Sequence, residues 1–254
     1  GKGGDDSAGR DIVSTLDGEG ISTVHVVYQK GGISQSSYII VESSTGCKKT
    51  YFTRGTIEPL APDEVSLDLL DEVDVLHVDA TSPRAQLKLM VAARERGVTV
   101  VLDNEQPNPH SEELVANCDI LVASERFASQ LTGEGALEAM CRALLERGPS
   151  TVVVTLGDEG SVAMGREEGV LHRREAHPAD VLDTTGAGDV FHGAFIYGIA
   201  NDWPLDKSVA FANVAAGESC RTLGGRSVTL DVEAFRRLVA ARIVVRSADQ
   251  HHHL

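Results

Sequence analysis

The residues best suited to chemistry lie in one glycine-rich segment, DTTGAGD at residues 183–189, which leads into an apolar stretch at 190–200. Gly186 and Gly188 lack a Cβ, so the backbone can turn tightly here and approach a ligand closely. A helix that begins after this turn points its free N–H groups and positive dipole end into the turn, which creates an anion hole. Asp189 would stay ionised in the first helical turn and could accept a proton from an attacking hydroxyl. Positioning, charge stabilisation and a base are what phosphoryl transfer requires.

A simpler interpretation of this segment is a tight strand-to-helix turn that Asp189 merely caps. Two other phosphate-binding patterns do not fit. The dinucleotide fingerprint G-x-G-x-x-G is absent, because Phe191 stands where its third glycine would be. A Walker A loop is also absent, because no Gly-Lys-Ser/Thr follows the turn.

The elements that must position this segment follow from the hydrophobic pattern after residue 73. Apolar runs alternate with stretches of helical periodicity, which predicts a mostly parallel sheet covered on both faces. A hairpin is expected just before the glycine-rich segment. The predicted strands span 73–78, 98–102, 120–123, 151–156, 161–164 and 170–174, and the predicted helices span 84–96, 112–116, 127–131, 137–146, 190–200, 205–221 and 232–241.

The first 55 residues have a different character. A short helix is predicted at 8–17, and three runs rich in β-branched and aromatic residues follow at 24–28, 37–41 and 49–53. Gly31-Gly32 and the polar stretch 43–46 separate these runs. The pattern predicts a small antiparallel meander with hairpin turns.

Composition restricts the class of protein. The chain has 254 residues, of which 42% are hydrophobic and 24% charged, and this suits one α/β domain with at most a small appendage. A formal charge of −15 disfavours a nucleic-acid partner. Neither a membrane-spanning run nor a signal-peptide pattern is present, so we expect no membrane partner and a cytoplasmic location.

The cysteines and the terminal histidines carry no functional prediction. Four scattered cysteines without a C-x-x-C pair indicate free thiols that pack as small apolar groups in a reducing compartment: Cys47, Cys118, Cys141 and Cys220. The histidine run at 251–253 is typical of a tag remnant or a frayed end.

The segment at 183–194 resembles the C-terminal signature of the PfkB carbohydrate kinases, whose pattern runs D-T-x-G-A-G-D. The resemblance implies a ribokinase-like three-layer α/β/α sandwich with a mostly parallel sheet and a small β lid that closes over a sugar. It implies an α/β core at 1–23 and 56–245, a lid at 24–55 and a tail at 246–254. The implied reaction is ATP-dependent phosphorylation of a sugar hydroxyl with Mg²⁺ and, in many members, K⁺.

Site residues carry over by position. Asp189 matches the family's base, and Gly186, Ala187 and Gly188 match its anion hole. Asp183 and Thr185 match positions that help hold a monovalent cation. Asp5 falls in a stretch, GKGGDDSAG, that resembles the family's G-x-x-G-D-D-x-x-G segment, and this implies a place on the substrate side. The positions that match the ATP side are Thr155, Gly157, Gly160, Asn213 and Gly217.

Arg54 follows the aromatic pair Tyr51-Phe52 and resembles a lid arginine that clamps phosphate in fructokinase-like members. An exposed cation at a strand end is an equally good interpretation.

The sequence departs from the family pattern at the metal motif. Members often carry Asn-x-x-Glu before Leu-Thr-Gly, where it helps organise Mg²⁺ and phosphates. Here Leu-Thr-Gly stands at 131–133, but the preceding stretch reads Ser-Glu-Arg-Phe at 124–127. Phe127 replaces the acid, and whether the neighbouring Glu125 substitutes for it stays open.

A second departure concerns the beginning of the fold. Members normally begin with strands and a Gly-Gly-x-x-x-Asn segment that form much of the sugar pocket, and nothing here corresponds to them. A parallel sheet without these strands would expose its core and an unpaired edge, so we expect a longer parent protein.

Substrate identity rests on smaller similarities. The stretches at 190–194, 34–37 and 220–226 look most like those of sulfofructose kinases, followed by ketohexokinases, and this favours a ketose or ketose-like sugar. Arg54, Arg84 and Arg226 are cations that could face a sulfonate or phosphate. His192 could serve as a second acid–base group near Asp189, although packing against the sheet is the favoured interpretation.

Two other functions stay open. The altered metal motif fits a catalytically silent PfkB-like binding or regulatory subunit, which the intact Gly-Ala-Gly-Asp run opposes. Nucleoside and hydroxymethylpyrimidine kinases share the fold, but a lid of several strands argues against the pyrimidine kinases. The resemblance also implies a homodimer that forms through the lid edge.

Overall fold

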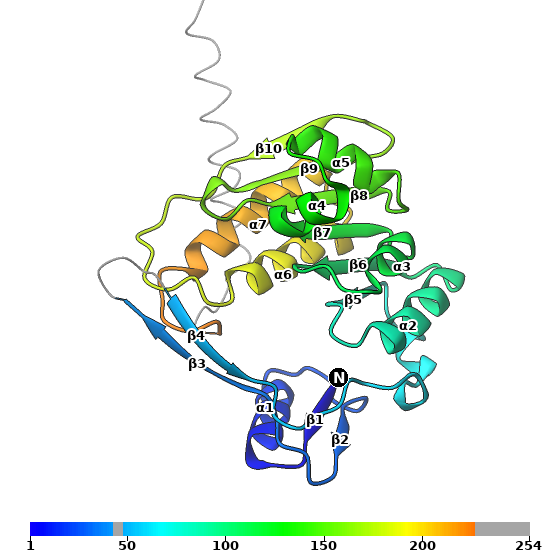
Figure 1. The fold of residues 1–254 in the computed structure, drawn as a ribbon, viewed down its shortest axis with the longest axis vertical. Coiled ribbons are helices and arrows are strands. Elements are labelled where there is room, and N and C mark those ends of the chain that lie inside the picture. Colours follow the sequence, from blue (N-terminus) through cyan, green and yellow to red (C-terminus); the bar gives the residue numbers. More distant parts are fainter. Residues whose placement is uncertain (43–47, 227–254) are drawn as a thin grey trace, which may run out of the picture.

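The computed structural model describes residues 1–42 and 48–226, and its central feature is a six-stranded sheet in the order β10-β9-β8-β7-β6-β5 (Figure 1). Four strands are parallel: β5 (Val75–Val78), β6 (Thr99–Asn104), β7 (Ile120–Ser124) and β8 (Thr151–Thr155). The hairpin β9 (Ser161–Gly165) and β10 (Leu171–Arg174) continues the sheet antiparallel beyond β8. The sequence pattern predicted all six strands, with differences at their ends only.

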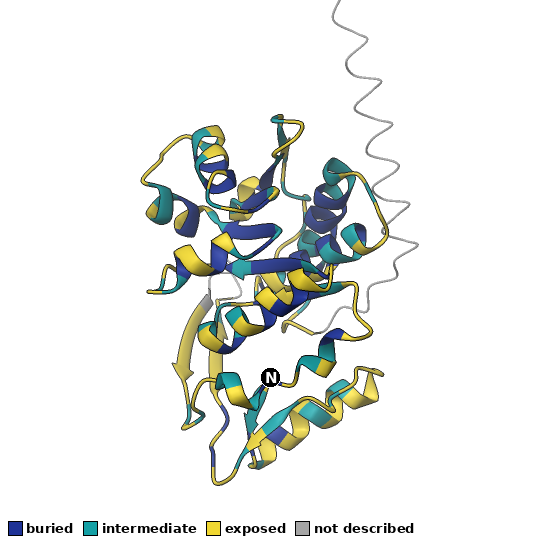
Figure 2. Ribbon diagram, turned by 90° about the vertical axis from the view of Figure 1, so that its right-hand side faces the viewer, coloured by how far each residue is buried: buried dark blue, intermediate teal, exposed yellow. Residues whose placement is uncertain are grey.

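Helices cover both faces of this sheet because alternate strand residues point to opposite sides. Val100, Leu102 and Leu121 pack with α2 (Pro83–Glu95), α3 (Ser111–Ala116), α4 (Glu125–Thr132) and α5 (Leu137–Leu145). Val101 and Val122 pack with α6 (Ala187–Ala200) and α7 (Leu205–Ser219) on the other face. The result is a three-layer α/β/α sandwich, whose buried residues lie along the strands and the inward sides of the helices (Figure 2).

Among the described residues, three short 3₁₀ turns connect the longer elements: Pro62–Glu64, Leu67–Leu70 and Gly157–Glu159. Cys118 and Cys141 are free and buried, as predicted, and Cys220 is buried too, whereas Cys47 lies outside the described residues. Burial raises the pKa of Cys118 to about 12 and that of Cys141 to about 11. Within the part of the chain that the structure describes, no helix is both long enough and apolar enough to cross a membrane.

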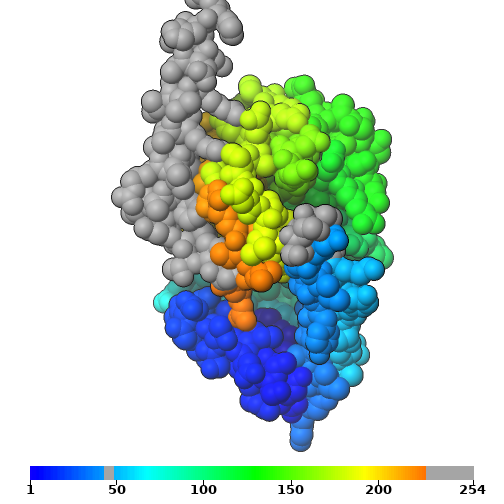
Figure 3. Space-filling model, turned by 90° about the vertical axis from the view of Figure 1, so that its left-hand side faces the viewer, coloured from blue at the N-terminus to red at the C-terminus, as the bar shows by residue number. Residues whose placement is uncertain are grey.

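The elements within residues 1–42 and 48–53, here called the N-terminal layer, differ from the predicted meander. β2 (Val27–Gln29) pairs in parallel with β1 (Lys2–Gly4), and only β3 (Ser36–Val41) and β4 (Lys48–Thr53) form an antiparallel ribbon. The predicted three-stranded meander is therefore wrong, because the first of its strands pairs with the beginning of the chain. Figures 1 and 3 show this layer (blue) at one end of the sandwich.

Asp6 holds this layer together. It caps α1 (Ser7–Gly18) by accepting a hydrogen bond from the Gly9 N–H at 2.9 Å. Its carboxylate also accepts from the backbone N–H of Ser34 at 2.9 Å and from the Ser34 hydroxyl at 2.8 Å. The Gly9 and Ser34 hydrogen bonds keep the pKa of Asp6 below its ordinary value of 3.8. The helix predicted at 232–241 and the tail lie outside the described residues.

Candidate active site

The glycine-rich segment forms the start of α6. Gly186 is the N-cap of the helix and adopts a left-handed conformation with φ of 77°. The first regular helical hydrogen bond runs from the Val190 N–H to the Gly186 carbonyl at 2.9 Å. The N–H groups of Gly188 and Asp189 therefore precede the helical ladder and point toward the turn. The expected anion hole stays a prediction for this turn. The helix begins at Ala187, before the residue 190 expected from hydrophobicity.

A backbone loop lies against this turn. A Cβ added at Gly186 would lie 2.7 Å from the Cα of Gly225, so a larger residue cannot occupy the position without a backbone shift. The buried Asp183 connects the two segments, since its carboxylate accepts hydrogen bonds from the Thr185 N–H at 2.9 Å, the Thr185 hydroxyl at 2.7 Å and the Gly224 N–H at 2.9 Å. Asp183 and Thr185 thus shape the loop beside the turn at Gly186.

Asp189 is exposed in the first turn of α6 and has acidic neighbours. Glu105 follows β6, and its Oε1 lies 3.8 Å from the point that a Cβ on Gly188 would occupy. The Ser124 hydroxyl, at the end of β7, donates to the Glu105 carbonyl at 3.0 Å. The turn therefore faces the carboxyl ends of the parallel strands, where ligands bind in open α/β sheets.

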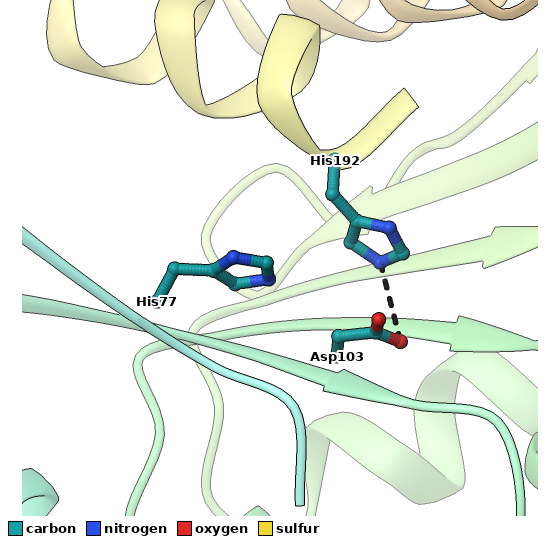
Figure 4. Close-up of side chains that lie close together, drawn as sticks. All are labelled: His77, Asp103 and His192. Carbon is teal, nitrogen blue, oxygen red and sulfur yellow. Dashed lines mark ion pairs between the residues drawn. The ribbon is translucent and has the colours of Figure 1, made fainter. Parts of the chain in front are cut away.

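Three further polar residues meet between α6 and the sheet (Figure 4). His192 of α6 is buried, with its Nε2 3.4 Å from Asp103 Oδ1 at the end of β6. The ring of His77 from β5 stacks on His192 with centroids 5.5 Å apart. Burial above all raises the pKa of Asp103 to about 6; His192 opposes this rise, while Glu105, Asp79 and Asp189 add to it. Partial loss of hydration lowers the pKa of His77, and the positive charge that His192 carries when it is protonated lowers it further.

His192 packs against the strands, as the favoured interpretation of the sequence predicts. His77, Asp103 and Glu105 are site residues that the sequence reasoning missed. A usable signal existed for the two acids, because they directly follow the apolar run predicted as a strand at 98–102. Polar residues at the carboxyl end of a buried strand point to a site.

The residues predicted for the ATP side lie around the ends of β8 and α7. Thr155 ends β8, Gly157 begins the following 3₁₀ turn with φ of 64°, and Gly160 closes that turn with φ of 94°. Asn213 is buried in α7, and its amide donates to the Ser161 hydroxyl at 2.7 Å and to the Val209 carbonyl at 3.0 Å. Gly217 lies close to His177, because a Cβ added at Gly217 would lie 2.7 Å from the Cβ of His177. Asn213 therefore has a packing role whether or not it meets a nucleotide.

Asp5 and Arg54 belong to the N-terminal layer. Asp5 is exposed and accepts a hydrogen bond from the Gly31 N–H at 2.8 Å, and Arg54 is exposed just after β4. Figure 3 shows the orange part of the chain, which comprises α7 and the segment after it, reaching this layer. The loop that touches Gly186 belongs to that part of the chain.

The whole described chain matches one family. The sequence pattern of the pfkB family of carbohydrate kinases matches residues 1–231. This chain belongs to that family. It is 27% identical to the 5-dehydro-2-deoxygluconokinase of Geobacillus kaustophilus over 237 residues, which cover 84% of this chain and 70% of the relative. It is 25% identical to the ketohexokinase of Mus musculus over a region that covers 84% of this chain and 74% of the relative.

Solved structures confirm the fold. The ribokinase of Arabidopsis thaliana, solved in complex with ribose and ATP, superposes with a TM-score of 0.78 at 24% identity, covering 94% of this chain and 80% of that one. The ribokinase of Thermotoga maritima superposes with a TM-score of 0.77 at 24% identity, covering 93% of this chain and 80% of that one. The predicted ribokinase-like α/β sandwich is therefore confirmed, and the protein is a PfkB-type carbohydrate kinase.

The altered metal motif of this pfkB protein has a packing explanation. Phe127 is completely buried among the core residues on the α4 side of the sheet, while its backbone N–H donates to the Ser124 hydroxyl at 3.1 Å. Glu125, the first residue of α4, is exposed. The acid that many members carry at position 127 would thus point into the core here, and Glu125 is the acid of this motif that faces solvent.

Proposed function

We propose that this protein transfers the γ-phosphoryl group of ATP to a hydroxyl of a ketose or ketose-like sugar, with Asp189 as the base. The observation that carries the proposal is the start of α6, where Asp189 follows the turn at Gly186, Ala187 and Gly188 and the N–H groups of Gly188 and Asp189 precede the first helical hydrogen bond. The kinship with a ketohexokinase supports the ketose preference.

In the proposed reaction, the Asp189 carboxylate accepts the proton of the attacking sugar hydroxyl. The N–H groups of Gly188 and Asp189, together with the positive end of the α6 dipole, stabilise the negative charge on the oxygens of the transferring phosphoryl group. Such preorganised donors need no reorientation during the reaction, which is the main requirement of phosphoryl transfer.

Two acids suit Mg²⁺: Glu105 lies beside the turn, and Glu125 follows Ser124, whose hydroxyl donates to the Glu105 carbonyl. Glu105 and Glu125 offer carboxylate oxygens, the ligands that Mg²⁺ prefers in proteins, and they would hold it together with the phosphates of the nucleotide. The ion would neutralise charge on the β- and γ-phosphates. We place K⁺ beside Asp183 and Thr185, because carboxylate and hydroxyl oxygens are the kind of ligand that a hard cation takes. Thr155, Gly157, Gly160 and Gly217 would border the nucleotide.

The experiment is an ATP-consumption assay with Mg²⁺ on a panel of ketoses, 6-substituted fructoses, aldoses and nucleosides. We expect stimulation by one ketose-like sugar. Asp189→Asn should keep nucleotide binding and lower kcat by about 10²–10⁴-fold, the usual contribution of a general base. Asp202→Asn, an exposed change just after the other end of α6, is the matched control and should keep wild-type kcat.

The other outcomes contradict parts of the proposal. A loss below about tenfold in Asp189→Asn refutes the role of the base. Stimulation by a nucleoside instead of a sugar refutes the substrate class. Nucleotide binding without any stimulated turnover refutes catalysis and leaves the silent-subunit function.

Dimerisation through the β3–β4 ribbon is part of the proposal. Apolar side chains are exposed on both strands, including Tyr38 at 75% and Phe52 at 54%. Exposed apolar side chains that gather on one element are typical of an association surface. Sedimentation of the wild type and of Phe52→Ser tests this, since the variant should shift the protein toward monomer.

A further inference from the structure

The cluster of His77, Asp103 and His192 has no function in the proposed reaction. The three residues come from β5, β6 and α6, and each offers one ligand atom within 4.8 Å of the other two. Figure 4 shows the two rings and the carboxylate turned toward a common point. Two imidazoles and a carboxylate are the donor set of many zinc sites.

The hydrogen bond of His192 fixes which of its nitrogens can bind a cation. Nδ1 lies 2.7 Å from the Gly188 carbonyl, which can only accept, so Nδ1 carries the proton. In the neutral ring Nε2 is then unprotonated and offers a lone pair. A metal-binding histidine commonly has this arrangement, in which the second nitrogen donates to a carbonyl and orients the ring.

His192 is only 6% exposed, and its Nε2 atom is buried without a hydrogen bond among the described residues. It faces Asp103 Oδ1 at 3.4 Å. A lone pair opposite a carboxylate is repulsive, and an unpaired buried polar atom is costly. A positive charge between the two atoms removes both penalties.

The separation of these two atoms suits a tetrahedral metal. Bonds of about 2.0–2.2 Å to nitrogen and oxygen place neighbouring ligands about 3.3–3.5 Å apart in such a site, and the observed Nε2–Oδ1 distance is 3.4 Å. His77 is the most exposed of the three, so its ring has room to turn inward. The surrounding charges favour a cation as well, since Asp79, Glu105 and Asp189 all act on Asp103.

We propose that His77, Asp103 and His192 bind a transition-metal dication of the zinc class, with the fourth position open to solvent or to a ligand. Imidazole nitrogens favour Zn²⁺, Co²⁺ and Ni²⁺ over Mg²⁺, so this site is separate from the magnesium of the kinase reaction. His192 is held by the carbonyl of Gly188, a residue of the anion hole. A metal here therefore fixes the turn that carries Asp189 and lowers the negative charge around it.

The test is a Co²⁺ titration of the metal-free protein in the absence of sugar and nucleotide, so it does not depend on the proposed kinase activity. All proteins carry His251→Ala, His252→Ala and His253→Ala, because terminal imidazoles bind the same metals. We expect one equivalent of Co²⁺, the visible absorption of tetrahedral cobalt, and displacement by Zn²⁺.

Variants locate the binding. Loss of an outer hydrogen-bond partner alone weakens metal affinity 10–100-fold, so His192→Gln and Asp103→Asn should each weaken it by at least about 100-fold. His77→Ala changes an exposed residue and should weaken binding without unfolding the protein. The matched control is His172→Gln, which removes another histidine 3.1 Å from a carboxylate, that of Glu168, and should leave binding unchanged.

A proton in place of the metal would overturn the proposal. Nitrogen-15 NMR distinguishes the two, because Zn²⁺ should shift Nε2 of His192 and leave Nδ1 protonated. A ring that is protonated on both nitrogens and unaffected by Zn²⁺ refutes the site. Binding that survives in His192→Gln, Asp103→Asn and His77→Ala also refutes it.

Discussion

Gly198 is the point of closest approach between the helix that carries Asp189 and its neighbour α7. A Cβ added at Gly198 would lie 2.5 Å from the Oγ, 2.8 Å from the Cβ and 3.1 Å from the Cα of Ser208. Ser208 is fully buried, and its hydroxyl donates to the Pro204 carbonyl at 3.2 Å. Gly198→Ala therefore forces α6 and α7 apart, because the Cβ and Cα of Ser208 cannot move unless the backbone moves.

Two opposing effects set the magnitude. Alanine is a better helix former than glycine by about 0.8–1.0 kcal/mol, and overpacking of a tight interface costs about 1–3 kcal/mol. Gly193→Ala on the same helix isolates the first effect, because no described atom outside that helix turn lies within 4 Å of its added Cβ. We expect Gly193→Ala to be more stable than wild type, and Gly198→Ala to be about 1–3 kcal/mol less stable than Gly193→Ala.

The assay is equilibrium urea unfolding, which gives the free energy of unfolding of each protein. For a chain of this size, 1 kcal/mol corresponds to about 2–4 °C in Tm, so thermal unfolding provides a second measurement. Ser208→Gly removes the Oγ and Cβ that clash, so it should recover part of the loss in a double-mutant cycle. Equal stability of Gly198→Ala and Gly193→Ala would show that the two helices do not pack as described.

Two further predictions concern residues outside α6. Phe127→Glu restores the acid of the family motif and should lower the free energy of unfolding by several kcal/mol in urea, because it buries a carboxylate. The control Phe127→Leu should cost less than about 1.5 kcal/mol. A stable Phe127→Glu protein would contradict the packing explanation. Because the folded pKa of Asp6 lies below 3.8, its stabilisation is fully present above that pH and disappears as the pH falls through the folded pKa. The difference in urea midpoint between wild type and Asp6→Asn should therefore shrink at acidic pH, and a constant difference would contradict this.

The sequence predicted the parts of the fold that depend on local patterns. Apolar runs between amphipathic helices located the strands and helices of the sandwich, and the glycines at 186 and 188 located the turn that begins α6. The beginning of α6 was placed late because its first turn, Ala187 to Asp189, is polar and glycine-containing, so hydrophobicity alone does not mark it.

Strand pairing in the N-terminal layer could not be predicted in the same way. β1 is a Lys-Gly-Gly stretch with no β propensity, and its pairing with Val27–Gln29 joins residues that are 25 positions apart. Residue types specify the partner of a strand only weakly when the strand is rich in glycine. The His77 contact was also out of reach, because only the three-dimensional arrangement brings β5 and α6 together.

The β3–β4 ribbon stands apart from the six-stranded sheet, and among the described residues no third strand pairs with it. An isolated two-stranded ribbon is only marginally stable in water. Its amide hydrogens should therefore exchange by local opening, at a free energy well below that of global unfolding, while the amides of β6 to β8 exchange only when the whole sandwich unfolds. A ligand or a second subunit that covers the ribbon would slow exchange there first. The two strands have six residues each, and each of these residues carries one backbone amide hydrogen. Protection of these amides can therefore reveal binding without any catalytic turnover.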